Sequence, residues 1–326
     1  MNFGCSMEMV NMHTSETGAF LKLSKSYWVE MFKLTAAAGF RGVELPYNPG
    51  NSSGLTRSGM PISSHVVRSR YGSPKDFIKL LREVGIDEVT GVHISANDVM
   101  AELISSGQGP DRLFNMLEEW AKEAIEFVLE LGGRGLVISP TPEIGLLDKY
   151  IGGEGKGWEV AFITEASAAI NRIGEVSSRS GVQACLKNEF WSLVRGSAFD
   201  KFFQSLDPAV IAYSPDLAHL KIAGVDPVGV MKKYAGRLAY IRFSDTSFED
   251  KEKNYLKIWA EYPVKGPQRV YMNMGEGSVN IPGVYRELEK SGYGGWIICE
   301  SKKTLNVHRA LLQMRWYLDH VVTKSK

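Results

Sequence analysis

The segment GVQACLKNEF (181–190) contains a short apolar run that ends in charged residues. Successive side chains of a β-strand point to opposite faces, so Ala184 and Leu186 share one face while Cys185, Lys187 and Glu189 share the other. One face therefore stays apolar to its end, while the other becomes charged toward the C-terminal end of the strand. In a β/α barrel the active site lies at the C-terminal ends of the strands. The segment is thus typical of a barrel strand whose inner end is polar.

Seven other short apolar runs alternate with helical patterns along the chain. With the first segment, the expected strands cover residues 3–9, 42–46, 89–94, 135–139, 182–188, 210–214, 238–243 and 296–300. Among the helical patterns, apolar residues recur at three- and four-residue steps over 113–131, and glycine then stops the helix at Gly132. Asp226 and Pro227 form a helix start. The alternation predicts a single (β/α)8 TIM barrel domain over residues 1–326.

Two connections are longer than a bare barrel requires. They follow the second and seventh strands, over residues 47–73 and 245–280, and the latter carries Tyr255, Trp259, Tyr262 and Tyr271. Because both follow C-terminal strand ends, we expect them to overhang the mouth of the barrel. Long loops in that place are usually lids or partner surfaces.

Composition excludes several classes of function. Acidic and basic residues nearly cancel, giving a formal net charge of +1 over 326 residues, and no basic stripe indicates a nucleic-acid partner. Cys5, Cys185 and Cys299 lack the spacing of a disulfide framework or a zinc site. No signal peptide and no apolar run of membrane length is evident. We therefore expect a cytoplasmic protein that binds a small molecule rather than a nucleic acid or a membrane.

Charged residues gather at the ends of the last four expected strands. They are Lys187, Glu189, Asp216, His219, Arg242 and Glu300. Charges from four strands can share one pocket only if they neutralise one another or a ligand. The pattern therefore predicts an active site, with a self-neutralised ion cluster over the barrel core as the alternative.

Other polar and aromatic residues allow two interpretations each. His93, at the end of the third strand, is either a substrate contact or a hydrogen-bonded core histidine, and Glu44 and Glu8 carry the same ambiguity. Phe190 and Trp191 directly follow the fifth strand. They either form an apolar wall against a substrate ring or simply pack.

Several segments resemble the xylose-isomerase-like TIM barrel superfamily. They are GFRGVELPY (39–47), SPDLAHLKIAGVDP (214–227), RLAYIRFSDT (237–246) and MGEGSVNIPGVYRELEKSGYGGWIICE (274–300). This superfamily includes sugar phosphate isomerases and epimerases, inosose dehydratases and type IV apurinic endonucleases (the family 2 AP endonuclease type). The resemblance spans nearly the whole chain and implies the barrel fold, but it does not fix the substrate.

The resemblance also implies a ligand set for one divalent metal ion. Family members use Glu, Asp, His and Glu from strands five to eight. Asp216 and Glu300 match two of these ligands, and His219 matches a histidine that contacts substrate. Lys187 stands at the strand-five Glu position and Arg242 at the strand-seven His position.

Two interpretations of these departures remain open. In the first, Lys187 and Arg242 take the role of the cation between Asp216 and Glu300, and the metal is lost. In the second, Glu189 replaces the missing ligand and joins Asp216 and Glu300 in an oxygen-rich site for Mn²⁺ or Mg²⁺.

The family chemistry begins with removal of a proton next to a carbonyl group, which gives an enediolate. On that basis Glu300 or Glu189 is the expected base, and His219 donates to a substrate oxygen. Arg242 and Lys187 stabilise the developing negative charge, and Lys187 is also a candidate base or Schiff-base nucleophile.

The resemblance leaves three functions open. The first is a sugar isomerase or epimerase that works through an enediolate. The second is a lyase, either a dehydratase or a C-glycoside deglycosidase that cleaves a 3-keto-glycoside. The third is a catalytically silent barrel that serves as a subunit of a complex. In each case we expect a homo- or hetero-oligomer that binds a sugar or glycoside.

Overall fold

Eight parallel strands form the centre of the molecule in a computed structural model that describes residues 1–9, 24–49, 63–152, 157–262 and 269–325. The strands are β1 (Asn2–Ser6), β2 (Gly42–Pro46), β3 (Glu88–Ser95), β4 (Gly135–Ser139), β5 (Gln183–Lys187), β6 (Ile211–Ser214), β7 (Ile241–Phe243) and β8 (Trp296–Cys299). Each overlaps the run of residues predicted for it. The strand order is β6-β5-β4-β3-β2-β1-β8-β7.

The sheet curls into a nearly closed barrel. β1 pairs with both β2 and β8, while β6 and β7 meet only through isolated parallel bridges, at Tyr213 with Leu238 and at Asp216 with Arg242. β7 is shorter than the predicted 238–243, because Tyr240 has a φ of 51° and leaves the extended conformation. The bridge at Asp216 and Arg242 holds two predicted site residues side by side.

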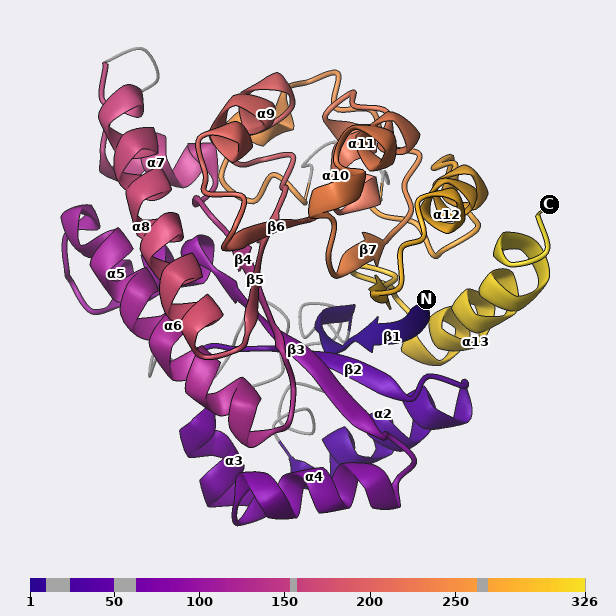
Figure 1. Ribbon diagram of the computed structural model, residues 1–326. Coiled ribbons are helices and arrows are strands. Elements are labelled where there is room, and N and C mark those ends of the chain that lie inside the picture. Colours follow the sequence, from indigo (N-terminus) through magenta and orange to yellow (C-terminus); the bar gives the residue numbers. More distant parts are fainter. Residues whose placement is uncertain (10–23, 50–62, 153–156, 263–268, 326) are drawn as a thin grey trace.

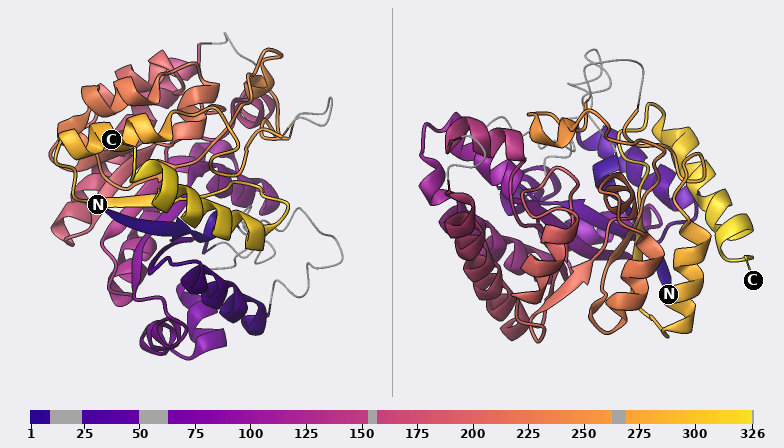
Figure 2. Two further views of the ribbon diagram at one scale, coloured as in Figure 1. Left: turned by 90° about the vertical axis from the view of Figure 1, so that its right-hand side faces the viewer. Right: turned by 90° about the horizontal axis from the view of Figure 1, so that it is seen from above.

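Helices surround the strands (Figure 1). Their bounds are α2 (Lys25–Ala37), α3 (Ser64–Tyr71), α4 (Pro74–Glu83), α5 (Ala96–Ser105), α6 (Leu113–Glu130), α7 (Ile144–Tyr150), α8 (Glu159–Arg179), α9 (Ser197–Gln204), α10 (Leu217–Ile222), α11 (Pro227–Lys233), α12 (Ile281–Lys290) and α13 (Val307–Tyr317). The predicted stop at Gly132 and cap at Asp226 are both confirmed, since Gly132 has a φ of 78° and Asp226 accepts the backbone N–H groups of Val228 and Gly229. The last helix, α13, lies beside the first strand, β1 (Figure 2).

The two long connections differ in structure. The one after β2 is not loop throughout, because α3 begins at Ser64; residues 50–62 lie outside the described part of the chain. The connection after β7 contains a 3-10 turn, η6 (Asn254–Leu256), and its residues 263–268 also lie outside the described part. Asp245 anchors this second connection by accepting backbone N–H groups of Thr246, Gly275, Gly277 and Val279.

The interior of the barrel has two layers. The lower layer lies further from the C-terminal ends of the strands and is apolar. It contains Val137, Cys185, Tyr240 and Ile298, which come from four different strands or strand starts. Two residues further along the same segments, the inward side chains are Ser139, Lys187, Arg242 and Glu300. The predicted alternation along β5 is thereby confirmed, since Ala184 and Leu186 pack instead into the main core with the helices.

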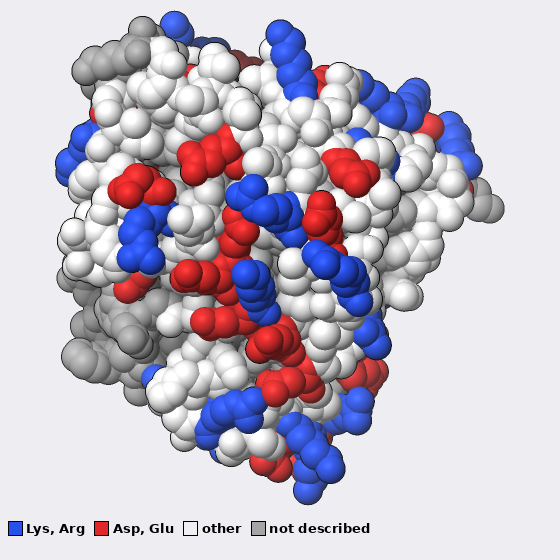
Figure 3. All heavy atoms as spheres, turned by 60° about the vertical axis from the view of Figure 1, so that its left-hand side comes forward, with Lys and Arg blue, Asp and Glu red and all other residues white. Residues whose placement is uncertain are grey.

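The outer face over α6 and α8 mixes charges of both signs. Figure 3 shows acidic and basic side chains interspersed there, and the pairs include Arg172 with Glu118 and Arg68 with Glu130. This face therefore offers no basic patch of the kind that binds nucleic acid. None of the described helices combines the length and the apolar character needed to cross a membrane.

Candidate active site

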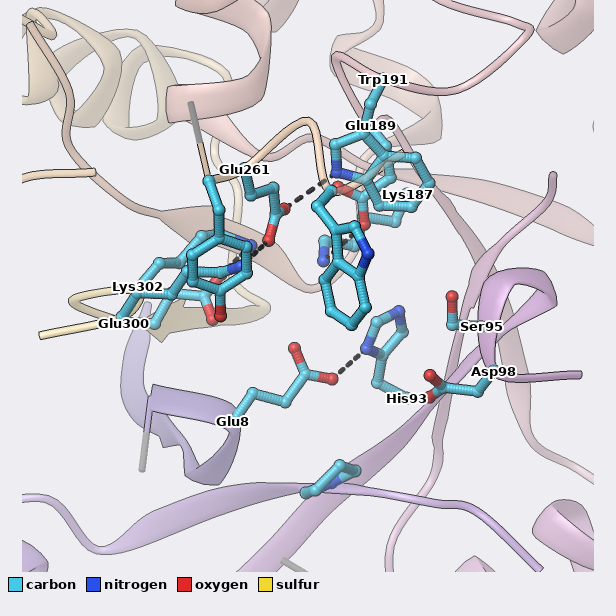
Figure 4. A pocket seen from close by; sticks show the side chains of 14 residues that line it. Glu8, His93, Ser95, Asp98, Lys187, Glu189, Trp191, Glu261, Glu300 and Lys302 are labelled. Carbon is cyan, nitrogen blue, oxygen red and sulfur yellow. Dashed lines mark hydrogen bonds and ion pairs between the residues drawn. The ribbon is translucent and has the colours of Figure 1, made fainter. Parts of the chain in front are cut away.

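A polar pocket opens at the C-terminal ends of the strands (Figure 4). Its polar side is lined by Glu8, His93, Lys187, Glu189, Glu300 and Lys302. Strand alternation explains why Lys187 and Glu189 both point inward, and the same spacing of two residues places Glu300 and Lys302 together after β8. The pocket therefore lies where a barrel positions its chemistry.

Arg242 forms the base of an ion cluster beneath the pocket. The fully buried guanidinium donates to Glu44 at 2.5 Å and to Glu300 at 3.4 Å, and it lies 3.9 Å from Asp216 Oδ2 and 3.7 Å from Glu8. Burial alone would lower the pKa of Arg242, but Glu44, Glu300 and the other carboxylates raise it well above its usual value. Arg242 is therefore a permanent cation that holds these carboxylates in place.

Lys302 was not among the residues predicted from the sequence, yet it lies between two that were. Its Nζ is 3.0 Å from Asp216 Oδ2 and 2.9 Å from Glu300 Oε1. The sequence held a signal for it: Lys302 follows Glu300 by two residues, as Glu189 follows Lys187, so both residues of each pair turn to the same side.

Both carboxylate oxygens of Glu189 have polar contacts, and Oε1 accepts a hydrogen bond from Ser139 whereas Oε2 has an ion-pair contact only. Oε1 lies 2.8 Å from Lys187 Nζ and accepts from Ser139 Oγ at 2.8 Å, while Oε2 lies 2.7 Å from His219 Nε2. Burial would raise the pKa of Glu189, but His219 and Lys187 lower it well below its usual range. Without a bound substrate, Glu189 is therefore a firmly held carboxylate and a weak base.

The hydrogen bonds of His219 determine its tautomer. The backbone N–H of Phe190 donates to Nδ1 at 3.0 Å, so the ring proton of the neutral imidazole is on Nε2. Nε2 faces Glu189 and the hydroxyl of Tyr271, which is 3.1 Å away. His219 thus donates toward Glu189 and is buried behind it rather than lining the pocket.

His93 links the other side of the pocket to Glu189. Its Nδ1 contacts Glu8 Oε1, and its Nε2 lies 2.9 Å from Ser139 Oγ, which donates to Glu189. Burial would raise the pKa of Glu8, but His93, Lys187 and Arg242 lower it well below its usual range. A hydrogen-bonded chain therefore runs from Glu8 through His93 and Ser139 to Glu189.

The connection after β7 supplies one wall of the pocket. Trp259, Glu261 and Tyr262 line it together with Trp191, so the described part of this connection does overhang the mouth, as predicted. Glu261 accepts from Trp191 Nε1 at 2.9 Å and from the Tyr271 hydroxyl at 2.7 Å, and it pairs with Lys303. Glu261 could not be predicted from the sequence, because its position depends on how a long irregular segment folds back over the barrel.

The predicted site residues all lie at this end of the barrel, but at two depths. His93, Lys187, Glu189, Trp191 and Glu300 line the pocket. Four others, Glu44, Asp216, His219 and Arg242, are fully buried behind it. Asp216 caps α10, accepts from Ser244 Oγ at 2.6 Å, and has a pKa well below its usual value because Lys302, His219 and Lys187 outweigh the effect of burial.

Two groups of residues are candidates for a divalent metal ion. Glu189, His219 and Glu261 each place one ligand atom within 4.8 Å of the others. His219 does not fit this role, because a metal needs a lone pair on Nε2. Freeing that lone pair would move the ring proton to Nδ1, where it would face the N–H of Phe190.

The second candidate group, Asp216, Glu300 and Glu189, does not fit a metal either. The ammonium of Lys302 already bridges Asp216 and Glu300. Mg²⁺ would need both carboxylate oxygens within roughly 2.1 Å. The Lys302 ammonium occupies the space between the two carboxylates, so a divalent ion could bind there only after this side chain had moved away.

Comparisons with known proteins place this geometry in context. A family model described as a xylose isomerase-like TIM barrel matches residues 32–318. The inosose dehydratase of Lacticaseibacillus casei is 24% identical over 203 residues, which is 60% of this chain and 67% of that protein. The inosose dehydratase of Bacillus licheniformis is 25% identical over 154 residues, 46% of this chain and 51% of that protein. The chain thus spans between half and two thirds of these relatives' lengths.

Solved structures share the fold at lower identity. A probable 3-DHS dehydratase from Bacillus anthracis superposes with a TM-score of 0.66 and 12% identity, covering 98% of this chain and 100% of that one. A D-allulose 3-epimerase from Methylomonas sp. superposes with a TM-score of 0.64 and 14% identity, covering 98% and 97%. At such identities the likeness shows the barrel fold alone.

Proposed function

The chain belongs to the xylose isomerase-like TIM barrel family, and on this premise we propose that it removes a proton next to the carbonyl group of a sugar or keto-sugar. The observation that carries the proposal is at Glu300. This residue lines the pocket, and its Oε2 is buried with no hydrogen-bond partner in the described part of the chain. Its other oxygen is held by Lys302 and Arg242. One carboxylate oxygen is thus fixed while the other keeps its lone pairs for a substrate proton.

Glu300 suits the role of base better than Glu189. Both line the pocket and each has one buried oxygen without a hydrogen bond, but both oxygens of Glu189 lie within 2.8 Å of a basic group and its pKa is held well below the usual range. A general base works best when its pKa is near the operating pH. We therefore assign proton removal to Glu300 and the orientation of neighbouring groups to Glu189.

Two lysines are placed to stabilise the enediolate. Lys187 and Lys302 both line the pocket, so their ammonium groups can approach the substrate oxygen on which negative charge develops. Arg242 lies behind the lining and acts through Glu300, as a positioning residue. No step of this scheme requires a metal ion, and the residues present do not fit one.

His93 is the proposed acid. It lies on a different side of the pocket from Glu300, with Glu8 at Nδ1 (Figure 4). Its Nε2 lies 2.9 Å from Ser139 Oγ. In an isomerase or epimerase, the proton taken by Glu300 is balanced by a proton returned to the enediolate. His93 supplies that returned proton, and Glu300 and His93 then regain their starting protonation by exchange with solvent, because the hydrogen-bonded chain from His93 through Ser139 ends at Glu189 and not at Glu300.

A lyase is the second candidate, favoured by the relatives named inosose dehydratase. In that reaction Glu300 takes the proton from carbon, the electron pair forms a C=C bond, and the C–O bond of a β-hydroxyl breaks. The leaving hydroxyl takes a proton from His93 and departs as water. Both candidates share the first step, removal of the proton from carbon by Glu300, so a measurement of that step tests both.

The charges of the pocket favour an uncharged substrate. Lys187, Lys302 and Lys303 each pair with a carboxylate, at Glu189, Glu300 and Glu261 respectively. Among the described lining residues, no lysine is left unpaired for a phosphate group. We therefore propose an unphosphorylated sugar, keto-polyol or glycoside, bound beside Trp191 and Trp259.

The test is exchange of the hydrogen next to the substrate carbonyl with deuterium from D₂O. NMR would follow an inosose, several ketohexoses and a 3-keto-glycoside with the wild type, with Glu300→Gln, and with Glu30→Gln as an exposed control. We expect exchange or turnover of at least one compound, and a loss of about 1,000-fold or more in Glu300→Gln alone. Exchange that persists in Glu300→Gln would overturn the assignment of the base. No exchange with any compound would favour the silent subunit.

A further inference from the structure

We propose that the ammonium group of Lys302 is the resident cation of this site and occupies the place between Asp216 and Glu300 that would otherwise suit a divalent metal ion. The binding part of this inference depends on the geometry alone. Its catalytic part rests on the proposed function.

Chain geometry fixes Lys302 in this place. Lys302 follows Glu300 by two residues, and Ser301 between them turns away, accepting the backbone N–H of Met274 through its hydroxyl. The Lys302 side chain is only 10% exposed, and its Nζ also lies 5.5 Å from the centre of the Tyr271 ring. The ammonium is therefore held by the wall of the pocket as well as by the two carboxylates.

Asp216 Oδ2 is the point on which the cations converge. Four basic groups lie within 4.0 Å of it: Lys302 at 3.0 Å, and Lys187, Arg242 and His219 at 3.9 Å each. A divalent ion that bound this oxygen at ligand distance would have to displace the Lys302 ammonium, which lies 3.0 Å from it. Arg242 pairs with Glu44 and His93 with Glu8, so these two pairs contribute little net charge at this oxygen.

The ammonium also has a hydrogen bond left for substrate. A lysine ammonium has three N–H donors, and Lys302 contacts Asp216 and Glu300 as ion pairs. Its ammonium can also donate to a substrate oxygen, because Lys302 lines the pocket. The two carboxylates at 3.0 and 2.9 Å favour the charged form of this ammonium. Lys302 is thus a catalytic cation rather than a base.

Metal binding provides the first test and needs no substrate. Elemental analysis of the purified protein and calorimetric titration with MnCl₂ would compare the wild type with Lys302→Ala, Lys302→Arg and the triple variant Lys187→Glu/Arg242→His/Lys302→Ala. We expect no stoichiometric metal in the wild type or in Lys302→Arg, and Mn²⁺ affinity in the triple variant at least about 100-fold higher than in the wild type. Lys303→Ala is the matched control, because Lys303 pairs with Glu261 instead, and it should gain no affinity.

One equivalent of tightly bound Mn²⁺ in the wild type would overturn the inference. Should the triple variant fail to fold, the wild type and Lys302→Arg still decide, since both retain a cation at this place. This outcome is independent of any activity, so failure of the inference and failure of the proposed function are separate results.

Chemical rescue provides the second test. In Lys302→Ala, we expect hydrogen exchange to fall by about 100-fold or more and to recover in part when methylammonium is added. Added Mn²⁺ should not restore it. Recovery with Mn²⁺ but not with methylammonium would contradict the catalytic part of the inference.

Discussion

The two layers of the barrel interior come from the same strands but have opposite chemistry. Val137, Cys185, Tyr240 and Ile298 form an apolar layer, and the residues two positions later form a charged or hydrogen-bonding one. Two residues of a strand span only about 6.6 Å. Stability and chemistry are therefore separated in this barrel by a single repeat of the strand.

The layers also differ in what keeps them stable. The lower layer is stabilised by removing apolar surface from water. The upper layer buries charges, which is tolerable only because each carboxylate faces a cation: Glu44 faces Arg242, Glu189 faces Lys187, and Glu300 faces both Arg242 and Lys302. Removal of one charge from the upper layer should therefore lower the free energy of unfolding more than removal of one methyl group from the lower layer.

The largest effect is expected for Arg242→Met, which keeps the volume but removes the cation. Glu44, Glu300 and Asp216 would then lose their shared partner. We expect the free energy of unfolding to fall by about 3–5 kcal/mol. We also expect this variant to lose the exchange of the substrate hydrogen with deuterium. Urea titration at pH 7 would measure it. A loss below about 1 kcal/mol would show that the upper layer does not depend on its internal ion pairs.

Acid should have the next largest effect. The pKa values of Glu189, Asp216 and Glu261 lie below those of the unfolded chain, so their contribution is complete above about pH 5 and is lost as the pH falls. Lys302 has a raised pKa, so its contribution is complete below about pH 10 and declines only above that.

Urea midpoints measured from pH 7 to pH 3 would test this. We expect a loss of about 1–2 kcal/mol of unfolding free energy per buried carboxylate by pH 3, and no change between pH 7 and pH 9. In Asp216→Asn the slope on the acid side should be smaller than in the wild type. An identical slope would mean that Asp216 does not contribute in this way.

The smallest effect is expected in the lower layer. Ile298→Val removes one methylene group from the apolar cluster and should lower the free energy of unfolding by about 0.5–1.5 kcal/mol. The rate at which each folded molecule exchanges the substrate hydrogen with deuterium should stay unchanged, because Ile298 does not line the pocket. A change in exchange as large as that of an upper-layer variant would contradict the separation of the layers.

Much of this fold could be predicted from the sequence, because alternation and apolar runs are local signals. The eight strands overlap the predicted ranges, and the inward face of β5 was assigned correctly from its period of two. The shortening of β7 was not predictable in this way, since the positive φ of Tyr240 depends on its packing inside the barrel.

The site could be predicted only where it lies at strand ends. Asp216, Arg242 and Glu300 come together as expected from their places after or within β6 to β8. The difference in depth between lining and buried residues depends on the three-dimensional packing. Lys302 lies three residues beyond the end of β8, where strand alternation is a weak guide, and the segment that carries Glu261 has no periodic pattern.

The most direct measurement is a crystal structure determined in the presence of millimolar MnCl₂, with anomalous scattering recorded for manganese. We expect continuous side-chain density for Lys302 reaching Asp216 and Glu300, and no anomalous peak between the two carboxylates. An anomalous peak bonded to both carboxylates, with the Lys302 side chain displaced, would contradict this expectation.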